Sequence, residues 1–202
     1  MQLPGCREIE LSEKSEFGGW YYLKIYLIRH GKVDYEWSKW CNSIEFDKMC
    51  FEYDTAKIKP MITNTNVANG VQHLYVSELR RTHETAQALY PTMHFQINPL
   101  INEVPLKSAF DSNIKLPLVI WNICGRLQWM LNINRQQEIK RKTIDRATKV
   151  IKELSSKNKN CILITHGFYM HTLIKELKRY GYLVNNRHVS FSNLEVVEAV
   201  LE

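Results

Sequence analysis

Two short apolar stretches of the chain are each followed directly by a histidine and a glycine. The first, residues 23–28, has almost no polar position and leads into the sequence RHG. The second, residues 161–165, reads CILIT and leads into the sequence HG. Strands that are covered on both faces, as in a parallel sheet, show this unbroken apolar pattern. Both stretches are therefore predicted to be central strands, each with a histidine just beyond its carboxyl end.

Strand and helix patterns alternate along the rest of the chain. Ser77 has the type of side chain that is preferred at a helix N-cap, so a helix is predicted to begin there. The alternation predicts an α/β protein, a three-layer α/β/α sandwich with a mostly parallel central sheet. The further predicted strands lie within residues 71–76, 94–97 and 189–201, and the predicted helices span residues 78–90, 136–157 and 168–180.

The chain has 202 residues, which is enough for one well-buried core and short for two. Residues 1–22 are polar without a clear period, and we expect an N-terminal extension of the kind that is often poorly ordered. Residues 23–202 are predicted to form a single domain. Within this domain, residues 108–131 show no regular pattern and are predicted to be an insertion or a lid.

Composition narrows the possible partners. The 27 basic and 21 acidic residues give a formal net charge of +6, which is compatible with an anionic ligand. No basic run is interleaved with aromatic residues densely enough to indicate nucleic-acid binding. Five cysteines without a CxxC pair indicate neither a disulfide framework nor a zinc site. No stretch is apolar enough to span a membrane and no signal peptide is evident, so we expect a cytoplasmic protein without a membrane partner.

The predicted strand ends bring several reactive side chains to one place. Because parallel strands end at the same edge of a sheet, their carboxyl ends present side chains to a common site. The first strand end presents Arg29 and His30, the next presents residues 77–81, the third presents Glu103, and the last presents His166. We expect these residues to converge on one site.

The motifs LIRHG, SELRRTHETA, INE and ITHG together resemble those of the histidine phosphatase superfamily, which has the phosphoglycerate-mutase-like fold. The resemblance implies that His30 accepts the phosphoryl group and that Arg29 and Arg81 bind phosphate. It identifies His166 as the second histidine of the family pattern and Glu103 as its acid. The implied substrate is a small phosphorylated molecule, while the oligomeric state stays open.

Phosphoryl transfer gives each of these side chains a role. A neutral His30 can attack phosphorus, and neighbouring arginines lower its pKa and so favour the neutral form. Arg29 and Arg81 can grip the phosphoryl oxygens with their forked guanidinium groups. His166 is expected to donate a hydrogen bond as charge develops, and Glu103 to protonate the leaving oxygen and then activate water. No metal ion or other cofactor is required by this scheme.

Two other functions stay open at this point: a phosphoglycerate-type mutase and a non-catalytic phosphate-binding protein on the same fold. The tryptophan- and glycine-rich segment of the cofactor-dependent mutases is missing, which favours a phosphatase. Asp34 and Glu36 are the next candidates for the acid if Glu103 does not fill that role. Residues 108–130 are a segment with aromatic side chains, among them Trp121. We expect this segment either to determine which substrates the protein accepts or only to pack within the fold.

Overall fold

The strand β1 (Leu23–Arg29) lies inside a six-stranded sheet. The structure, a computed structural model, describes residues 22–61, 70–185 and 192–201. On one side β1 pairs in parallel with β6 (Cys161–Thr165), and on the other it pairs antiparallel with β8 (Val196–Leu201). Ile25, Leu27 and Ile28 are almost completely buried. The prediction of two central strands is confirmed.

The order of strands across the sheet is β4, β3, β6, β1, β8, β7. The strands β3 (His73–Val76) and β4 (Phe95–Ile97) continue the parallel part beyond β6. Among the described strands of this sheet, only β8 runs against its neighbours, β1 and β7 (Leu183–Asn185). A mostly parallel central sheet therefore forms, as predicted, and its parallel strands all end at the same edge.

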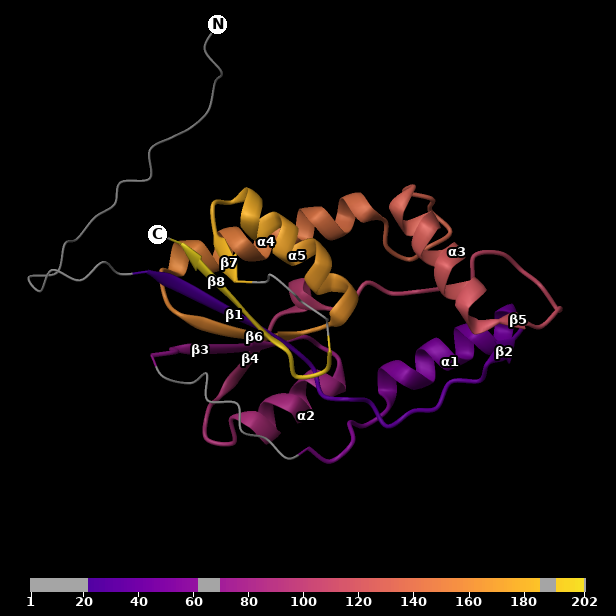
Figure 1. Ribbon diagram of the computed structural model, residues 1–202, viewed down its shortest axis with the longest axis horizontal. Helices are drawn as coiled ribbons and strands as arrows, with labels where there is room; N and C mark the ends of the chain where they lie inside the picture. The colour runs from indigo at the N-terminus through magenta and orange to yellow at the C-terminus, as the bar shows by residue number, and fades with distance from the viewer. Residues whose placement is uncertain (1–21, 62–69, 186–191, 202) are drawn as a thin grey trace, which may run out of the picture.

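Helices cover both faces of this sheet, which gives three layers (Figure 1). On one face, α4 (Lys140–Lys157) and α5 (Gly167–Arg179) pack on side chains such as Leu27 and Leu163. On the other face, α2 (Arg80–Leu89) packs on Ile28 and its neighbours. The strands alternate their side chains between two apolar clusters, so both faces are buried. The predicted three-layer sandwich is confirmed.

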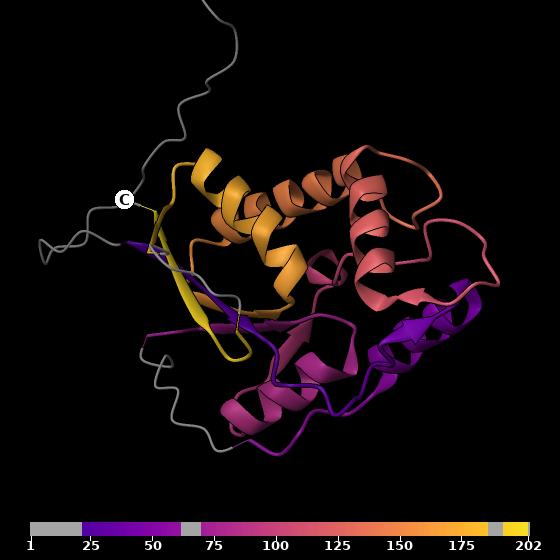
Figure 2. The same cartoon turned by 45° about the vertical axis from the view of Figure 1, so that its right-hand side comes forward.

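A further part of the molecule extends beyond the sheet edge and holds α1 (Ser43–Thr55) and α3 (Leu118–Met130) (Figures 1 and 2). The short strands β2 (Trp40–Cys41) and β5 (Leu116–Pro117) pair beside them. Trp121 is fully buried here, stacks on Phe46 at 5.8 Å between ring centroids, and donates a hydrogen bond from Nε1 to the Cys41 carbonyl oxygen. Trp121 is therefore a packing residue.

Neither α1 nor α3 was predicted, because neither shows a clear apolar stripe. Most side chains of α1 are partly exposed, whereas α3 is apolar on nearly every side and exposes Val119 and Ile123. A capping box at Asn42 and Glu45 marks the start of α1: the Asn42 side chain accepts from the Glu45 N–H, and the Glu45 carboxylate accepts from the Asn42 N–H.

Several predicted boundaries were wrong. The helix α2 begins at Arg80, with Leu79 as its N-cap, and not at Ser77. The Ser77 Oγ atom does accept a hydrogen bond from the Leu79 N–H, but the same oxygen also contacts His166. The helix α4 begins at Lys140, four residues later than predicted. In the last predicted strand only β8 is seen, while residues 189–191 and most of the proposed extension, residues 1–21, lie outside the described residues.

Candidate active site

The site begins where β1 and β6 end side by side. The His30 N–H donates to the Thr165 carbonyl oxygen at 3.0 Å, so the first motif is tied to the strand that carries the second. The side chain of His30 is buried, and its Nδ1 lies 2.7 Å from the Gly31 carbonyl oxygen. A carbonyl oxygen can only accept, so Nδ1 holds the proton and Nε2 of the neutral ring has the lone pair.

The surroundings of His30 keep its ring neutral. Burial is the main cause that lowers the pKa of His30 from 6.5 to about 3, and the positive charges of Arg81 and Arg29 add to the shift. At neutral pH the ring is therefore an uncharged base with its lone pair on Nε2. This is the form in which an imidazole is a nucleophile.

The second histidine lies against the first and orients an arginine. The rings of His30 and His166 have centroids 5.1 Å apart. Arg81 Nε donates to His166 Nδ1 at 3.1 Å, which leaves the ring proton on Nε2, 2.8 Å from the Ser77 Oγ atom. Burial and the Arg81 charge hold the pKa of His166 well below its usual value. Both ring nitrogens are thus engaged within the protein.

Arg81 is the central cation of the site. Its side chain is 1% exposed, and its Nη1 donates to Asp54 Oδ1 at 2.9 Å. Its guanidinium carbon also lies 5.1 Å from the centroid of the Tyr53 ring. Because Asp54 and Tyr53 belong to α1, Arg81 connects the sheet edge to the part of the molecule beyond it.

Arg29 lies against the first residue of α5. A Cβ atom at Gly167 would stand 2.9 Å from Arg29 Nε, closer than real Cβ atoms approach other atoms, and 3.1 Å from the guanidinium carbon, which is tighter than most real contacts. The absence of a side chain at Gly167 therefore leaves the space in which the Arg29 guanidinium lies. This contact explains why a glycine follows the second histidine.

Glu103 caps the same helix. Its Oε1 accepts hydrogen bonds from the N–H groups of Tyr169 and Val104, both at 2.9 Å, and its Oε2 accepts a longer one from Phe168 at 3.4 Å. A carboxylate at a helix N-terminus is favoured by the helix dipole and by the free N–H groups there. The turn that precedes Glu103 is anchored by Arg146, whose Nη1 donates to the carbonyl oxygens of residues 100 and 102.

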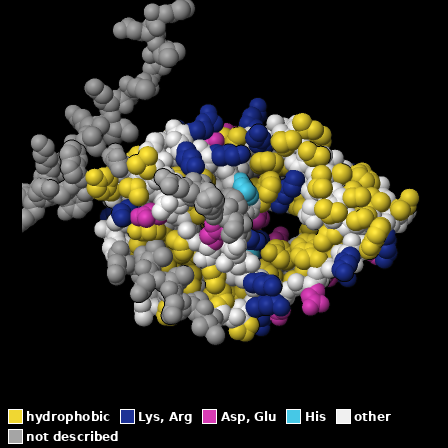
Figure 3. Space-filling model, in the orientation of Figure 1, with side chains coloured by type: hydrophobic (Ala, Val, Ile, Leu, Met, Phe, Trp, Pro, Cys, Tyr) yellow, Lys and Arg dark blue, Asp and Glu magenta, His cyan; other side chains and the backbone are white. Residues whose placement is uncertain are grey.

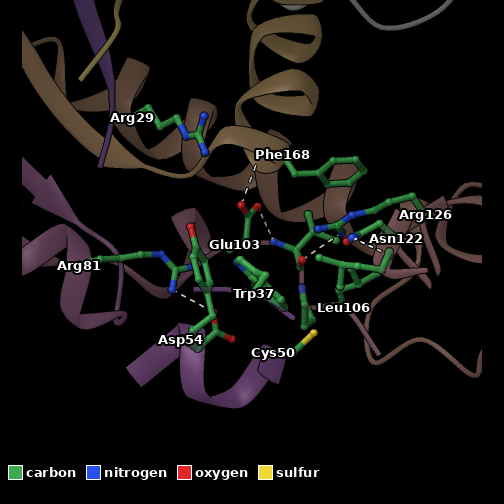
Figure 4. A pocket seen from close by; sticks show the side chains of 14 residues that line it. Arg29, Trp37, Cys50, Asp54, Arg81, Glu103, Leu106, Asn122, Arg126 and Phe168 are labelled. Carbon is green, nitrogen blue, oxygen red and sulfur yellow. Dashed lines mark hydrogen bonds and ion pairs between the residues drawn. The ribbon is translucent and has the colours of Figure 1, made fainter. Parts of the chain in front are cut away.

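These groups surround a cavity of about 370 Å³ that opens between the sheet edge and α1 and α3 (Figures 3 and 4). Arg29, Arg81 and Glu103 line it. His30 and His166 lie just behind them and do not line the cavity. The structure thus brings all five predicted residues to one sheet edge and exposes three of them to the cavity. The remaining lining residues are Trp37, Cys50, Tyr53, Asp54, Val104, Pro105, Leu106, Leu118, Asn122, Arg126 and Phe168.

Sequence reasoning missed Asp54, Asn122 and Arg126, which line the cavity from α1 and α3. No motif marks them, since they reach the cavity through the packing of two helices that were not predicted. The alternative acids named from the sequence, Asp34 and Glu36, do not line the cavity. Both are exposed, and Asp34 pairs with Lys59 at 3.5 Å. Asp54 is therefore the second carboxylate of the site.

Within the described residues, no group of three or more histidine, cysteine, aspartate or glutamate side chains could hold a metal ion. The described helices also include none that is both long and apolar enough to cross a membrane.

Comparison with known proteins identifies the family. No curated protein matches the chain. Among solved structures, a phosphoserine phosphatase from Entamoeba histolytica in complex with 3-phosphoglyceric acid is 13% identical, with a TM-score of 0.55 over 87% of this chain and 89% of that one. A mutant of the same enzyme in complex with phosphoserine is 14% identical, with a TM-score of 0.56 over 87% and 89% of the two chains.

A mycobacterial glucosyl-3-phosphoglycerate phosphatase is also 14% identical, with a TM-score of 0.50 over 78% of this chain and 80% of that one. At these identities the structures establish a shared phosphoglycerate-mutase-like fold. The family model described as histidine phosphatase superfamily (branch 1) matches residues 64–201, a range that includes Arg81, Glu103 and His166 and begins after the first motif. Since this match covers more than half of the 202 residues, the chain belongs to the histidine phosphatase superfamily.

Proposed function

We propose that the protein is a metal-independent phosphatase that hydrolyses small phosphomonoesters through a phosphohistidine on His30. The state of His30 is the observation that best supports this proposal. Its ring is neutral, its Nδ1 proton is fixed by the Gly31 carbonyl oxygen, and its lone pair is on Nε2, in surroundings that include the charges of Arg81 and Arg29. Membership of the superfamily and the phosphatase names of the similar structures support the same reaction class.

In the proposed first step, His30 Nε2 attacks phosphorus in line with the departing oxygen. Arg29 and Arg81, which line the cavity, hold the phosphoryl oxygens and neutralise their charge. The Nδ1–H bond to the Gly31 carbonyl oxygen stabilises the positive charge that the ring acquires. His166 acts through Arg81, because its Nδ1 accepts from Arg81 Nε and so fixes the plane of the guanidinium.

Glu103 is the proposed acid and base. It lines the cavity beside the two arginines and accepts hydrogen bonds from backbone N–H groups, whereas the other lining carboxylate, Asp54, is ion-paired with Arg81. Glu103 would give a proton to the leaving alkoxide and then take one from the water that attacks the phosphohistidine. The sequence of steps returns His30 to its neutral state and releases inorganic phosphate.

A phosphoenzyme experiment tests this proposal. The protein is incubated briefly with radiolabelled phosphoserine, quenched in alkali and examined for label that is stable to base and labile to acid, as expected for a phosphoramidate. We expect label in the wild-type protein and none in His30→Ala. His94→Ala is a matched control, because His94 is exposed and precedes β4 at the opposite edge of the sheet.

Full turnover of His30→Ala, or label that persists in it, would contradict the proposal. The same assay in the presence of a chelator tests independence of metal: strong loss that one divalent ion restores would require a different mechanism. Product analysis separates hydrolysis from the mutase alternative, which transfers phosphate to a second hydroxyl group. A protein that binds phosphate without turnover would be the non-catalytic alternative.

A further inference from the structure

We propose that Arg126 binds a second anionic group of the substrate, so that the protein selects small phosphomonoesters with a carboxylate or a second phosphate at the far end. This inference rests on the proposed function for the reacting phosphoryl group. It assigns a role to a lining residue that comes from α3, away from the strand ends.

The cavity has cations at two separate places. Arg29 and Arg81 come from β1 and α2 at the sheet edge, whereas Arg126 comes from α3. In Figure 4 the Arg126 side chain lies on the other side of Glu103 from Arg81. One phosphoryl group held by Arg29 and Arg81 would leave Arg126 for another part of the ligand.

Arg126 is held in place but is not neutralised. Its guanidinium carbon lies 3.7 Å from the centroid of the Phe168 ring, and its Nη1 donates to the Val104 carbonyl oxygen at 3.1 Å. Among the described residues it forms no ion pair within 4.0 Å, whereas the buried Arg81 is paired with Asp54. Burial lowers the pKa of Arg126, although the nearby Glu103 opposes the shift. A desolvated, oriented cation without a paired carboxylate is well suited to bind an anion.

The rest of the lining sets the kind of molecule that fits. Leu106 and Leu118 contribute apolar groups to the cavity, and Trp37 adds an aromatic side chain. Asn122 lies one helical turn before Arg126 on α3 and lines the cavity as well. A short carbon chain between the two anionic groups matches this lining better than a second sugar or a base would, in a volume of about 370 Å³.

The test uses pairs of substrates that differ only in the far charge. Phosphorylated ω-hydroxy acids with two, three or four methylenes are compared with their methyl esters, by kcat/KM. We expect wild type to favour the acid at one of these lengths by about 10-fold or more, since a charge-assisted hydrogen bond is typically worth such a factor. Arg126→Gln should lose about 10- to 100-fold on that acid and little on its ester.

Arg141→Gln is the matched control, because it removes the same charge from an exposed position on the neighbouring helix α4, outside the cavity. It should leave both substrates unchanged. Arg126→Lys keeps the positive charge but lacks the paired N–H donors of the guanidinium group, so it should retain part of the preference for the acid over its ester. Absence of any acid preference in wild type overturns the inference without needing a variant, and so does an equal loss on acid and ester in Arg126→Gln.

Calorimetry with non-hydrolysable phosphonates separates this inference from the proposed function. The ω-carboxyalkyl phosphonate, its methyl ester and the corresponding bisphosphonate are titrated into wild type and Arg126→Gln. Tighter binding of the acid or the bisphosphonate than of the ester, lost in Arg126→Gln, supports the inference even if no substrate turns over. The tighter of the two charged ligands identifies the second group as a carboxylate or a phosphate. Equal affinity for all three overturns the inference even if phosphatase activity is present.

Discussion

Replacing Gly167 by alanine should damage the site while leaving the fold intact. Gly167 is the first residue of α5 and does not have a positive φ angle, so alanine can adopt its backbone conformation. Alanine is also the better helix former, by about 0.5–1 kcal/mol. The added methyl group would stand 2.9 Å from Arg29 Nε, however, and the guanidinium is the part that must move.

The size of that movement sets the expected loss. Ordinary contact between such atoms begins near 3.4 Å, so the guanidinium is displaced by at least several tenths of an ångström. Misplacement of a positioning group by about 1 Å can cost roughly 100-fold in rate. We therefore expect kcat/KM on an aryl phosphate to fall by about 10- to 100-fold, while the free energy of unfolding in urea changes by less than about 1 kcal/mol.

A double-mutant cycle shows whether the loss passes through Arg29. In an Arg29→Ala background the methyl group has no guanidinium to displace, so Gly167→Ala should cause little further loss. Wild-type activity of Gly167→Ala would refute the reasoning, because it would mean that the position of the Arg29 guanidinium is unimportant. An equal loss in both backgrounds would also refute it, since the effect would then reach the site by another route.

Three further predictions concern stability at low pH, the proton transfer assigned to Glu103 and the packing of Trp121. Because the pKa of His30 in the folded protein is about 3 and that of a free histidine is 6.5, only the unfolded chain gains this proton as the pH falls below about 6.5. The free energy of unfolding should therefore drop by up to about 1.4 kcal/mol per pH unit from this group between pH 6.5 and 3, and urea titrations should show a shallower decline for His30→Gln. Glu103→Gln should slow turnover of alkyl phosphates by about 10²- to 10⁴-fold, because the leaving alkoxide no longer receives a proton. Formation of phosphohistidine from nitrophenyl phosphate should be spared, and this phosphoenzyme should accumulate because water is no longer activated. If Asp54→Asn shows this pattern instead, Asp54 is the acid. Trp121→Ala should destabilise the fold by about 3–5 kcal/mol in urea and leave the relative rates on different substrates unchanged, because its ring packs on Phe46 and Phe110 outside the cavity.

The central sheet could be predicted because the apolar pattern of each strand lies within a few consecutive residues and recurs in more than one strand. The two strands that carry the histidines have buried side chains on both faces and are apolar at most positions, so they can be recognised without knowing their register. Once these strands are parallel, their ends must meet, which places His30 near His166 without any further information. The same reasoning places Arg81 and Glu103 at that edge.

The rest of the cavity could not be predicted because it depends on contacts between distant segments. Asp54 lines the cavity from α1 and pairs with Arg81, 27 residues along the chain, and Arg126 lines it from α3. Ser77 was assigned as an N-cap from its residue type, but its hydroxyl group is drawn toward His166, 89 residues away. The Ser77 Oγ atom also accepts from the Leu79 N–H, but the helix itself begins at Arg80, so residue type alone predicted the wrong helix start.

The way in which the Arg81 guanidinium is held agrees with the phosphoryl-binding role proposed for it. Its Nε is used by His166 and one Nη1 proton by Asp54, so two sides of the guanidinium plane are fixed by the protein. No described residue accepts from its Nη2, and the side chain lines the cavity. Under the proposed function, a phosphoryl oxygen would bind at Nη2 without displacing either partner. Because both anchoring groups are already in place, the cation would not have to be reoriented during the proposed reaction, which is the condition under which electrostatic stabilisation is most effective.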